Sequence, residues 1–397
     1  LDDRPLLRQA LTGMLSYLLE QKADQYLATF PRLTGNRTSD WQIFARTYIA
    51  TIAHLPSLNE KDLVYTIIKA MVDSLHDDHA SFLPDAARAS TEDNTGLHAQ
   101  IQSQTDFGPG MRFGFYPTQL AYAAAPLVVR EVIPDSPAAQ AGIRPGDTIV
   151  TVNGLPPFLG KELLQPVLAL LSGQDPVKVQ IQRPGTTTLI TLTPSVFPLP
   201  PMVSSRQLSG NILYVRLTRF ETGATQQIST LVQQAGGPRL RGMILDLRGN
   251  GGGEVAEQQR LLGLFVHDRG LATFVDGQGQ SSEQKPDAHV ALLHLALVAL
   301  IDHECASACE NTAIDIRDLH LGRLVGERTA GLVSGPSTGY FLDDGSVLIL
   351  PAAFMYGPAG EMVDGIGVPP DEEVQPTPTQ LAAGQDPVLA KALQDFF

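Results

Sequence analysis

The sequence predicts a multidomain α+β protein with a helical N-terminal segment, a β-rich middle and an α/β core. Three observations support this prediction. Apolar residues recur at helical spacing from residue 5 to about residue 89, short apolar runs separated by glycine and proline fill residues 107–192, and strand-like and helix-like runs alternate from residue 212 onward. The domains are therefore expected at residues 1–95, 96–196 and 197–397.

Composition narrows the class of partner. The chain has 397 residues, is 43% apolar and carries a formal net charge of -14. Because nucleic acids attract basic surfaces, an acidic chain of this kind argues against a nucleic-acid partner. The most apolar run, residues 290–301, contains His294 and is shorter than the roughly 20 residues of a membrane-spanning helix. We expect a buried strand there and no transmembrane segment.

The N-terminal segment is amphipathic, with apolar side chains such as Leu7, Leu11, Met14 and Leu18 on one helical face. It ends in H-D-D-H-A-S-F, residues 76–82, and a polar linker follows. His76 and His79, the two histidines of this motif, could bind a metal or lie in a solvated loop. Neighbouring aspartates point to different faces and no H-E-x-x-H word is present, so no metal site is expected.

The middle segment contains five strand-like runs, residues 112–115, 127–129, 148–152, 177–181 and 188–192. Residues 135–154 read D-S-P-A-A-Q-A-G-I-R-P-G-D-T-I-V-T-V-N-G, which resembles the PDZ domain. A helix at residues 163–171 would form one wall of the peptide groove. The alternative is a β-rich spacer without a ligand.

The PDZ resemblance also implies a ligand site. In that family a loop before the second strand binds a peptide C-terminus through backbone N–H groups. The residues that match this loop are Arg112, Phe113, Gly114 and Phe115.

The C-terminal core opens with strands expected at residues 213–217 and 243–247 and helices expected at residues 225–234 and 254–265. Between strand and helix lies R-G-N-G-G-G, residues 248–253. This run lacks the lysine and the spacing of a phosphate-binding loop. It is either a tight turn or a set of backbone N–H groups that can bind a developing oxyanion.

Both cysteines of the chain, Cys305 and Cys309, lie in E-C-A-S-A-C-E around Ser307. Because a strand is expected before this word and a helix from residue 308 to 317, Ser307 lies at a helix N-terminus. The alternative to a nucleophile is a capping box, in which Ser307 and Glu310 satisfy the first turn.

Several short sequence motifs, taken in their order along the chain, resemble those of the C-terminal processing peptidases. They are L-D-L-R-G-N-G-G-G (245–253), C-A-S-A-C-E (305–310), L-V-G-E-R-T-A-G (324–331) and V-D-G-I-G-V-P-P-D (363–371), behind the PDZ word. The resemblance implies a core like the crotonase and Clp protease superhelix. It also implies that Ser307 is the nucleophile, because many members read S-A-S-A-S-E. The flanking cysteines would be small packing residues. A bridge between them is the alternative, possible at this spacing but strained.

The sequence differs from the lysine-dependent branch of this family at the position of the catalytic base. Leu332 stands where that branch has its lysine base, and no lysine occurs between Lys285 and Lys391. In the tricorn-like branch a histidine is the base, and His79 matches it. Asp364 matches the acid that orients this histidine, with Glu361 in reserve.

The resulting hypothesis is a serine endopeptidase without a cofactor. Gly252 or Gly253, together with Ala308, would bind the oxyanion. Substrates would be proteins or peptides whose C-termini the PDZ domain binds or whose access it regulates. The resemblance implies a location outside the cytoplasm, in the periplasm, the cell envelope or the medium, and leaves a homo-oligomer open. The alternatives are an inactive peptide-binding scaffold that has lost the lysine and a small-ligand carrier.

Overall fold

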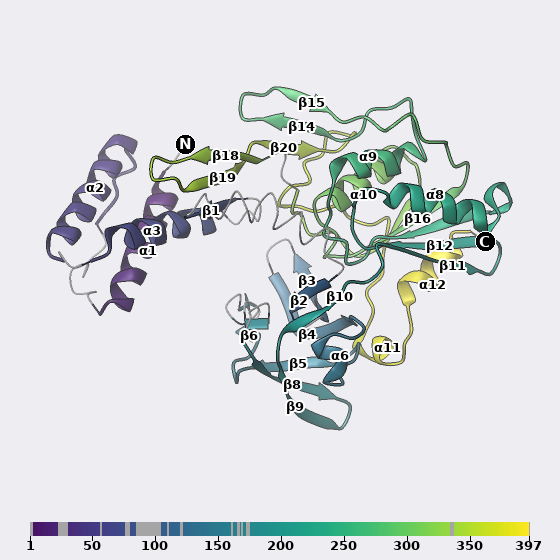
Figure 1. Cartoon of the computed structure of the whole chain (residues 1–397), viewed down its shortest axis with the longest axis horizontal. Coiled ribbons are helices and arrows are strands. Elements are labelled where there is room, and N and C mark those ends of the chain that lie inside the picture. Colours follow the sequence, from purple (N-terminus) through teal and green to yellow (C-terminus); the bar gives the residue numbers. More distant parts are fainter. Residues whose placement is uncertain are drawn as a thin grey trace. The chain divides into compact units, whose positions relative to one another are not determined.

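The structure is a computed structural model that describes residues 3–22, 31–55, 58–75, 80–84, 105–108, 111–119, 122–159, 162–164, 167, 170–171, 175–333 and 337–396. It divides into two compact units, which are described separately (Figure 1). The first unit contains Leu1–Thr95 and Ser334–Ala353, and the second contains Gly96–Val333 and Phe354–Phe397.

The first unit combines three helices with a small sheet. The helices are α1 (Arg4–Glu20), α2 (Arg37–Ala53) and α3 (Glu60–Asp73), and the antiparallel sheet has the order β1 (Ser81–Leu83), β19 (Val347–Pro351), β18 (Ser337–Phe341). The helical prediction is confirmed for these segments. Apolar side chains of α1 and α3 form its core, where an added Cβ atom at Gly13 would lie 2.7 Å from the Cβ atom of Ala70.

The second unit begins with an antiparallel β structure. Its five-stranded sheet has the order β3 (Met111–Gln119), β4 (Tyr122–Val132), β5 (Thr148–Val152), β8 (Val177–Arg183), β9 (Thr186–Leu192). Smaller elements are α6 (Pro137–Gln140) and the pairs β2 (Thr105–Gly108) with β10 (Ser195–Pro198) and β6 (Phe158–Leu159) with β7 (Glu162–Leu163). The five predicted strands are confirmed.

One prediction for this part is wrong at its start. The helix expected at residues 163–171 does not begin at Leu163, because Leu163 pairs with Phe158 in the hairpin of β6 and β7. Val167, Leu170 and Leu171 are helical, and residues 165, 166, 168 and 169 lie outside the described residues.

The core of the second unit is a six-stranded sheet in the order β11 (Val203–Leu208), β12 (Ile212–Leu217), β13 (Gly242–Asp246), β16 (Ala296–Ile301), β17 (Arg323–Gly326), β21 (Glu372–Glu373). Only β11 runs antiparallel to its neighbour within this sheet. The predicted strand at residues 290–301 is confirmed only from Ala296, since residues 290–295 are not in a strand.

Helices and a second small sheet complete this core. The helices are α8 (Ala224–Ala235), α9 (Val255–Gly263), α10 (Ala308–Asp318), α11 (Pro378–Ala382) and α12 (Pro387–Gln394), with a 3-10 turn η2 (Gly237–Arg239). The small sheet has the order β15 (Ser281–Glu283), β14 (Thr273–Asp276), β20 (Ala353–Tyr356). No helix among the described residues is long and apolar enough to cross a bilayer.

The parallel strands decide where polar groups gather. Because the carboxyl ends of parallel strands meet at one edge of a sheet, the loops after β13 and β16 lie next to each other. Two hydrogen bonds join these loops: the N–H of Gly249 donates to the side-chain Oδ1 of Asp302 at 3.0 Å, and the N–H of Ala306 donates to the carbonyl oxygen of Asn250 at 3.1 Å.

Candidate active site

Ser307 lies at the turn from β16 into α10 and has a backbone that L-residues rarely adopt, with φ 56° and ψ −123°. Its N–H donates to the carbonyl oxygen of Leu332 at 3.0 Å, and its own carbonyl oxygen accepts from Glu310 at 2.8 Å and Asn311 at 3.1 Å. Its side chain makes no capping hydrogen bond. The capping-box interpretation is therefore wrong, and the half-buried hydroxyl of Ser307 is not used to cap the helix.

A disulfide bond brackets this serine. Cys305 and Cys309 are bonded to each other, with 5.4 Å between their Cα atoms, and both are fully buried. Sequence reasoning favoured small packing residues over this bond, and that preference was wrong.

The glycine run lies directly against Ser307. A Cβ atom added to Gly252 would lie 2.8 Å from the Cβ atom of Ser307 and 3.0 Å from the backbone nitrogen of Ala308. Gly252 also has a φ of +103°, so a side chain is unfavourable there on two grounds. The run is thus more than a turn, because its backbone forms one wall beside the serine.

The amide groups near Ser307 differ in their partners. The N–H of Gly252 donates to Asn250 Oδ1 at 2.8 Å. The N–H groups of Gly253 and Ala308 donate to no other residue that the structure describes. The amides of Gly253 and Ala308 are therefore available to an incoming oxygen, whereas that of Gly252 is occupied in this conformation.

Asn250 organises this part of the site, although sequence reasoning did not single it out. It is fully buried, and its Nδ2 donates to the carbonyl oxygen of Leu217 at 3.0 Å while its Oδ1 accepts from Gly252. It thereby joins the end of β12 to the glycine run and to Ala306. The signal in the sequence is a polar side chain placed inside a run of glycines.

Glu310 is the second organising residue. Its buried carboxyl group accepts from Gly331 at 2.7 Å, from Leu332 at 2.8 Å and from the hydroxyl of Thr329. Burial raises the pKa of Glu310 to about 7 against these hydrogen bonds, which lower it. Since Leu332 accepts from Ser307, Glu310 fixes the segment that lies beside the serine.

The two candidate acids have different surroundings. Asp364 is half-buried in a segment that is attached to the same region, because Gly365 donates to the carbonyl oxygen of Gly331 at 2.7 Å. Glu361 is exposed, and its Oε2 lies 2.5 Å from Nη2 of Arg317 in an ion pair. The segment that contains Asp364 is thus bonded to Gly331, whereas Glu361 pairs with Arg317.

The other predicted site residues are His79 and residues 112–115. His79 belongs to the first unit and lies outside the described residues. Arg112, Phe113, Gly114 and Phe115 lie in β3, where Phe113 pairs with Val129 and Gly114 with Val128 of β4. The described residues contain no group of three or more His, Cys, Asp and Glu side chains that could hold a metal.

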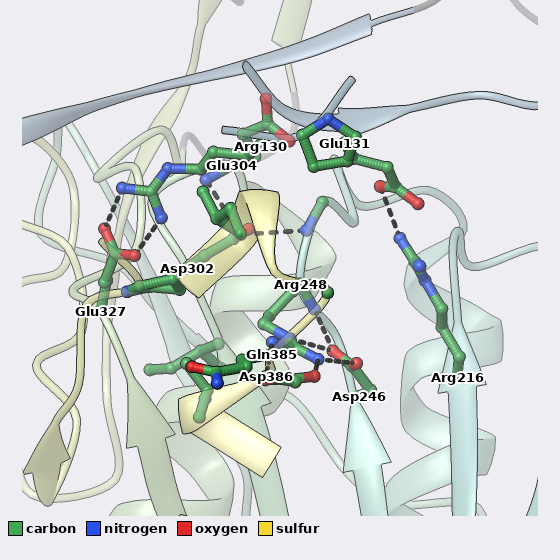
Figure 2. A pocket seen from close by; sticks show the side chains of 17 residues that line it. Arg130, Glu131, Arg216, Asp246, Arg248, Asp302, Glu304, Glu327, Gln385 and Asp386 are labelled. Carbon is green, nitrogen blue, oxygen red and sulfur yellow. Dashed lines mark hydrogen bonds and ion pairs between the residues drawn. The ribbon is translucent and has the colours of Figure 1, made fainter. Parts of the chain in front are cut away.

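A cavity of about 270 Å³ lies between the PDZ-like sheet, the core and the C-terminal helices. Figure 2 shows its arginines paired with acids: Arg130 with Glu327, Arg216 with Glu131, and Arg248 between Asp246 and Asp386. These pairs join three parts of the second unit, so the cavity is a junction between those parts.

Comparison with known proteins agrees with this fold. Residues 211–374 match peptidase family S41, and residues 128–183 match the PDZ domain. Residues 211–374 are thus similar to peptidase family S41, and a segment similar to the PDZ domain precedes them. The resemblance to the C-terminal processing peptidases is thereby confirmed.

Two similar proteins are named as C-terminal processing peptidases. The chloroplastic C-terminal processing peptidase of Tetradesmus obliquus is 34% identical over 283 residues, which are 64% of this chain and 58% of that protein. The chloroplastic carboxyl-terminal-processing peptidase 2 of Arabidopsis thaliana is 29% identical over 358 residues, which are 86% of this chain and 66% of that protein. The chain thus spans less than two thirds of the length of either relative.

A solved structure shares the fold. The photosystem II D1 C-terminal processing protease superposes with a TM-score of 0.57 at 24% identity, over 93% of each chain.

Proposed function

We propose that this protein is a serine endopeptidase that cleaves proteins or peptides with Ser307 as its nucleophile. The observation that carries the proposal is the position of Ser307: its hydroxyl is free of capping, it begins a helix, and the available amide of Ala308 follows it. A nucleophile on a sharp strand-to-helix turn next to such an amide suits acyl transfer.

In this mechanism the Oγ atom of Ser307 attacks the carbonyl carbon of the scissile bond. The negative charge that develops on the carbonyl oxygen is stabilised by the N–H of Ala308 and by a glycine amide. Gly253 has an available amide, and Gly252 can serve once Asn250 Oδ1 releases it. Water then hydrolyses the acyl-enzyme and restores the serine.

We assign the proton transfer to His79, with Asp364 holding the imidazole in the correct tautomer. The support is that leucine, which has no proton to exchange, occupies position 332 beside Ser307. His79 would take the proton of Ser307 during attack and give it to the leaving amine. This arrangement belongs to the histidine-dependent branch of the family.

We assign substrate capture to the PDZ domain, with the backbone of Arg112, Phe113, Gly114 and Phe115 binding a C-terminal carboxylate. We also place the protein outside the cytoplasm. A disulfide bond suits an oxidising compartment, and the two relatives described above are named as chloroplastic proteins.

A fluorophosphonate probe tests the nucleophile, because it reacts only with an activated serine. The folded protein should incorporate one probe per chain, and peptide mapping should place it on Ser307. Ser307→Ala should abolish both labelling and peptide cleavage, whereas the exposed control Ser204→Ala should change neither. A folded protein that is not labelled at Ser307 would instead support the inactive scaffold or the small-ligand carrier.

A further inference from the structure

We propose that the disulfide bond between Cys305 and Cys309 is a positioning element of the active site, and that peptide cleavage requires it to be intact. The bond closes a five-residue loop with Ser307 at its centre. The inference rests on the proposed function in one respect only, namely that Ser307 is the nucleophile.

The backbone of Ser307 needs an external constraint. A φ of 56° is unfavourable for a residue with a Cβ atom, and such a conformation persists only where the surrounding structure imposes it. If the constraint is removed, the turn can relax to an ordinary helical start, and the hydroxyl and the amide of Ala308 then point in other directions. The position of the nucleophile therefore depends on what holds this turn.

Backbone hydrogen bonds anchor the turn on both sides of Ser307. On its strand side, Cys305 donates to the carbonyl oxygen of Asp302 at 3.1 Å and accepts from Ala330 at 3.0 Å, and Ala306 donates to Asn250 at 3.1 Å. These bonds fix the chain before Ser307. On the helix side, Cys309 donates to the carbonyl oxygen of Ala306 at 3.1 Å.

The disulfide is the covalent connection across these two sides. It joins the anchored Cys305 to the first turn of α10 without passing through the dihedral angles of Ser307. When it is broken, the backbone hydrogen bond from Cys309 to Ala306 closes the loop directly, and residues 330–332 connect its two sides only through hydrogen bonds to Cys305, Ser307 and Glu310. The loss of the bond should therefore loosen the turn around Ser307 more than the rest of the fold.

Burial protects the disulfide bond from reduction in the folded protein. Both cysteines have 0% exposed surface, so a dithiol can reach the sulfur atoms only after the turn has opened. Reduction then transfers two electrons and two protons from the dithiol, giving two thiols on the protein and one oxidised dithiol. The folded protein should resist this reaction.

The experiment compares the same chain with and without the bond, so that no side chain changes. The protein is unfolded in urea, reduced with dithiothreitol and refolded without oxygen; a second sample passes through urea without reductant. Thiol titration should count two thiols per chain in the first sample and none in the second, because the sequence contains two cysteines.

We expect kcat of the reduced protein to fall about 10-fold or more while KM stays within about threefold, since the clamp acts on the nucleophile and leaves the PDZ groove unchanged. Re-oxidation should restore kcat. Amide hydrogen exchange at residues 307–310 should be about 10-fold faster or more in the reduced protein, with smaller changes in the PDZ domain.

The variant Cys305→Ser/Cys309→Ser is the matched control, because it keeps residues of similar size without a bond. It should resemble the reduced protein, and dithiothreitol should have no effect on it. If this variant does not fold, the comparison of reduced and oxidised wild-type protein still decides the question.

The proposal is overturned if the reduced protein keeps kcat within about twofold and shows unchanged exchange at residues 307–310. Failure of the proposed function looks different: the oxidised protein would then lack fluorophosphonate labelling and peptide cleavage. The exchange measurement would still report whether the bond holds the turn.

Discussion

Gly252 lies so close to Ser307 that an added Cβ atom would stand 2.8 Å from the Cβ atom of the serine. Gly252→Ala should therefore displace the nucleophile or the glycine run, and we expect kcat/KM to fall about 10²-fold or more. Initial rates on a peptide substrate measure this loss. Gly251→Ala is the matched control, because Gly251 is exposed and an added Cβ atom meets nothing within 4 Å. Equal activity of the two variants would contradict the contact.

His79 is predicted to be the general base, so kcat/KM should fall on the acid side through a pKa of roughly 6 to 7. Imidazole becomes protonated as the pH falls and can then no longer accept the proton of Ser307. His79→Ala should lower kcat about 10³-fold or more, whereas His76→Ala should have a small effect. Rates measured from pH 5 to pH 9 give the profile.

Two further variants sharpen this test. Leu332→Lys should not restore activity to His79→Ala, because position 332 was not selected to keep an ammonium group neutral. Since the pKa of Glu310 is also raised to about 7, Glu310→Gln shows which group causes the acid limb. The limb should remain in Glu310→Gln, and its disappearance would assign it to Glu310. Near-normal activity of His79→Ala would exclude His79 as the base.

Glu310 should make stability depend on pH. Its pKa rises from 4.5 in the unfolded chain to about 7 in the fold, so the folded state holds the proton more tightly. The stabilising contribution is complete below about pH 4.5 and is lost as the pH rises through 7. This shift corresponds to about 3 kcal/mol.

Urea unfolding of the wild type and of Glu310→Gln between pH 4 and pH 8 measures this contribution. As the pH rises, the wild type should lose about 3 kcal/mol of unfolding free energy relative to Glu310→Gln. Other titrating groups cancel in the difference. A difference that stays constant over this range would show that the carboxyl group does not titrate between 4.5 and 7.

The PDZ domain should bind a free C-terminal carboxylate. Binding of a peptide with an apolar C-terminus to the full-length Ser307→Ala protein should weaken about 10-fold or more when that terminus is amidated, because the loss of the charge removes charge-assisted hydrogen bonds. Isothermal titration gives both dissociation constants. Identical constants for acid and amide would leave residues 112–115 without a role in carboxylate capture.

Local patterns were enough to predict most elements of the fold. The strand at Gly242–Asp246 and the helix at Ala308–Asp318 were predicted within one residue of their observed N-termini, since alternation, apolar runs and glycine are local signals. The strand near residue 296 was predicted too long, because an apolar run shows burial without showing pairing. The sheet of β1, β19 and β18 was not predicted, since its partners lie far apart in the sequence.

The candidate site was predicted less completely. Ser307, Gly252 and Ala308 do lie together. They were found through the sequence motifs that the chain shares with the C-terminal processing peptidases. Glu310 was placed in a capping box because its spacing from Ser307 fits one, but its partners at Thr329 and Leu332 lie about 20 residues away and have no local signal. The same holds for Asn250, whose partner Leu217 belongs to another strand.

The ion pair of Arg130 with Glu327 sets a condition for exchanging PDZ domains between relatives. Both side chains are largely buried, and the two terminal guanidinium nitrogens of Arg130 contact the carboxylate. A chimaera whose new domain brought an uncharged residue to position 130 would remove the nearest cation of a buried carboxylate and leave it with His303 at 3.7 Å. Removing one partner of a buried ion pair typically costs about 3–5 kcal/mol. Modular replacement in this protein therefore requires compatible charges at the domain boundary, or the simultaneous replacement of Glu327 by an apolar residue.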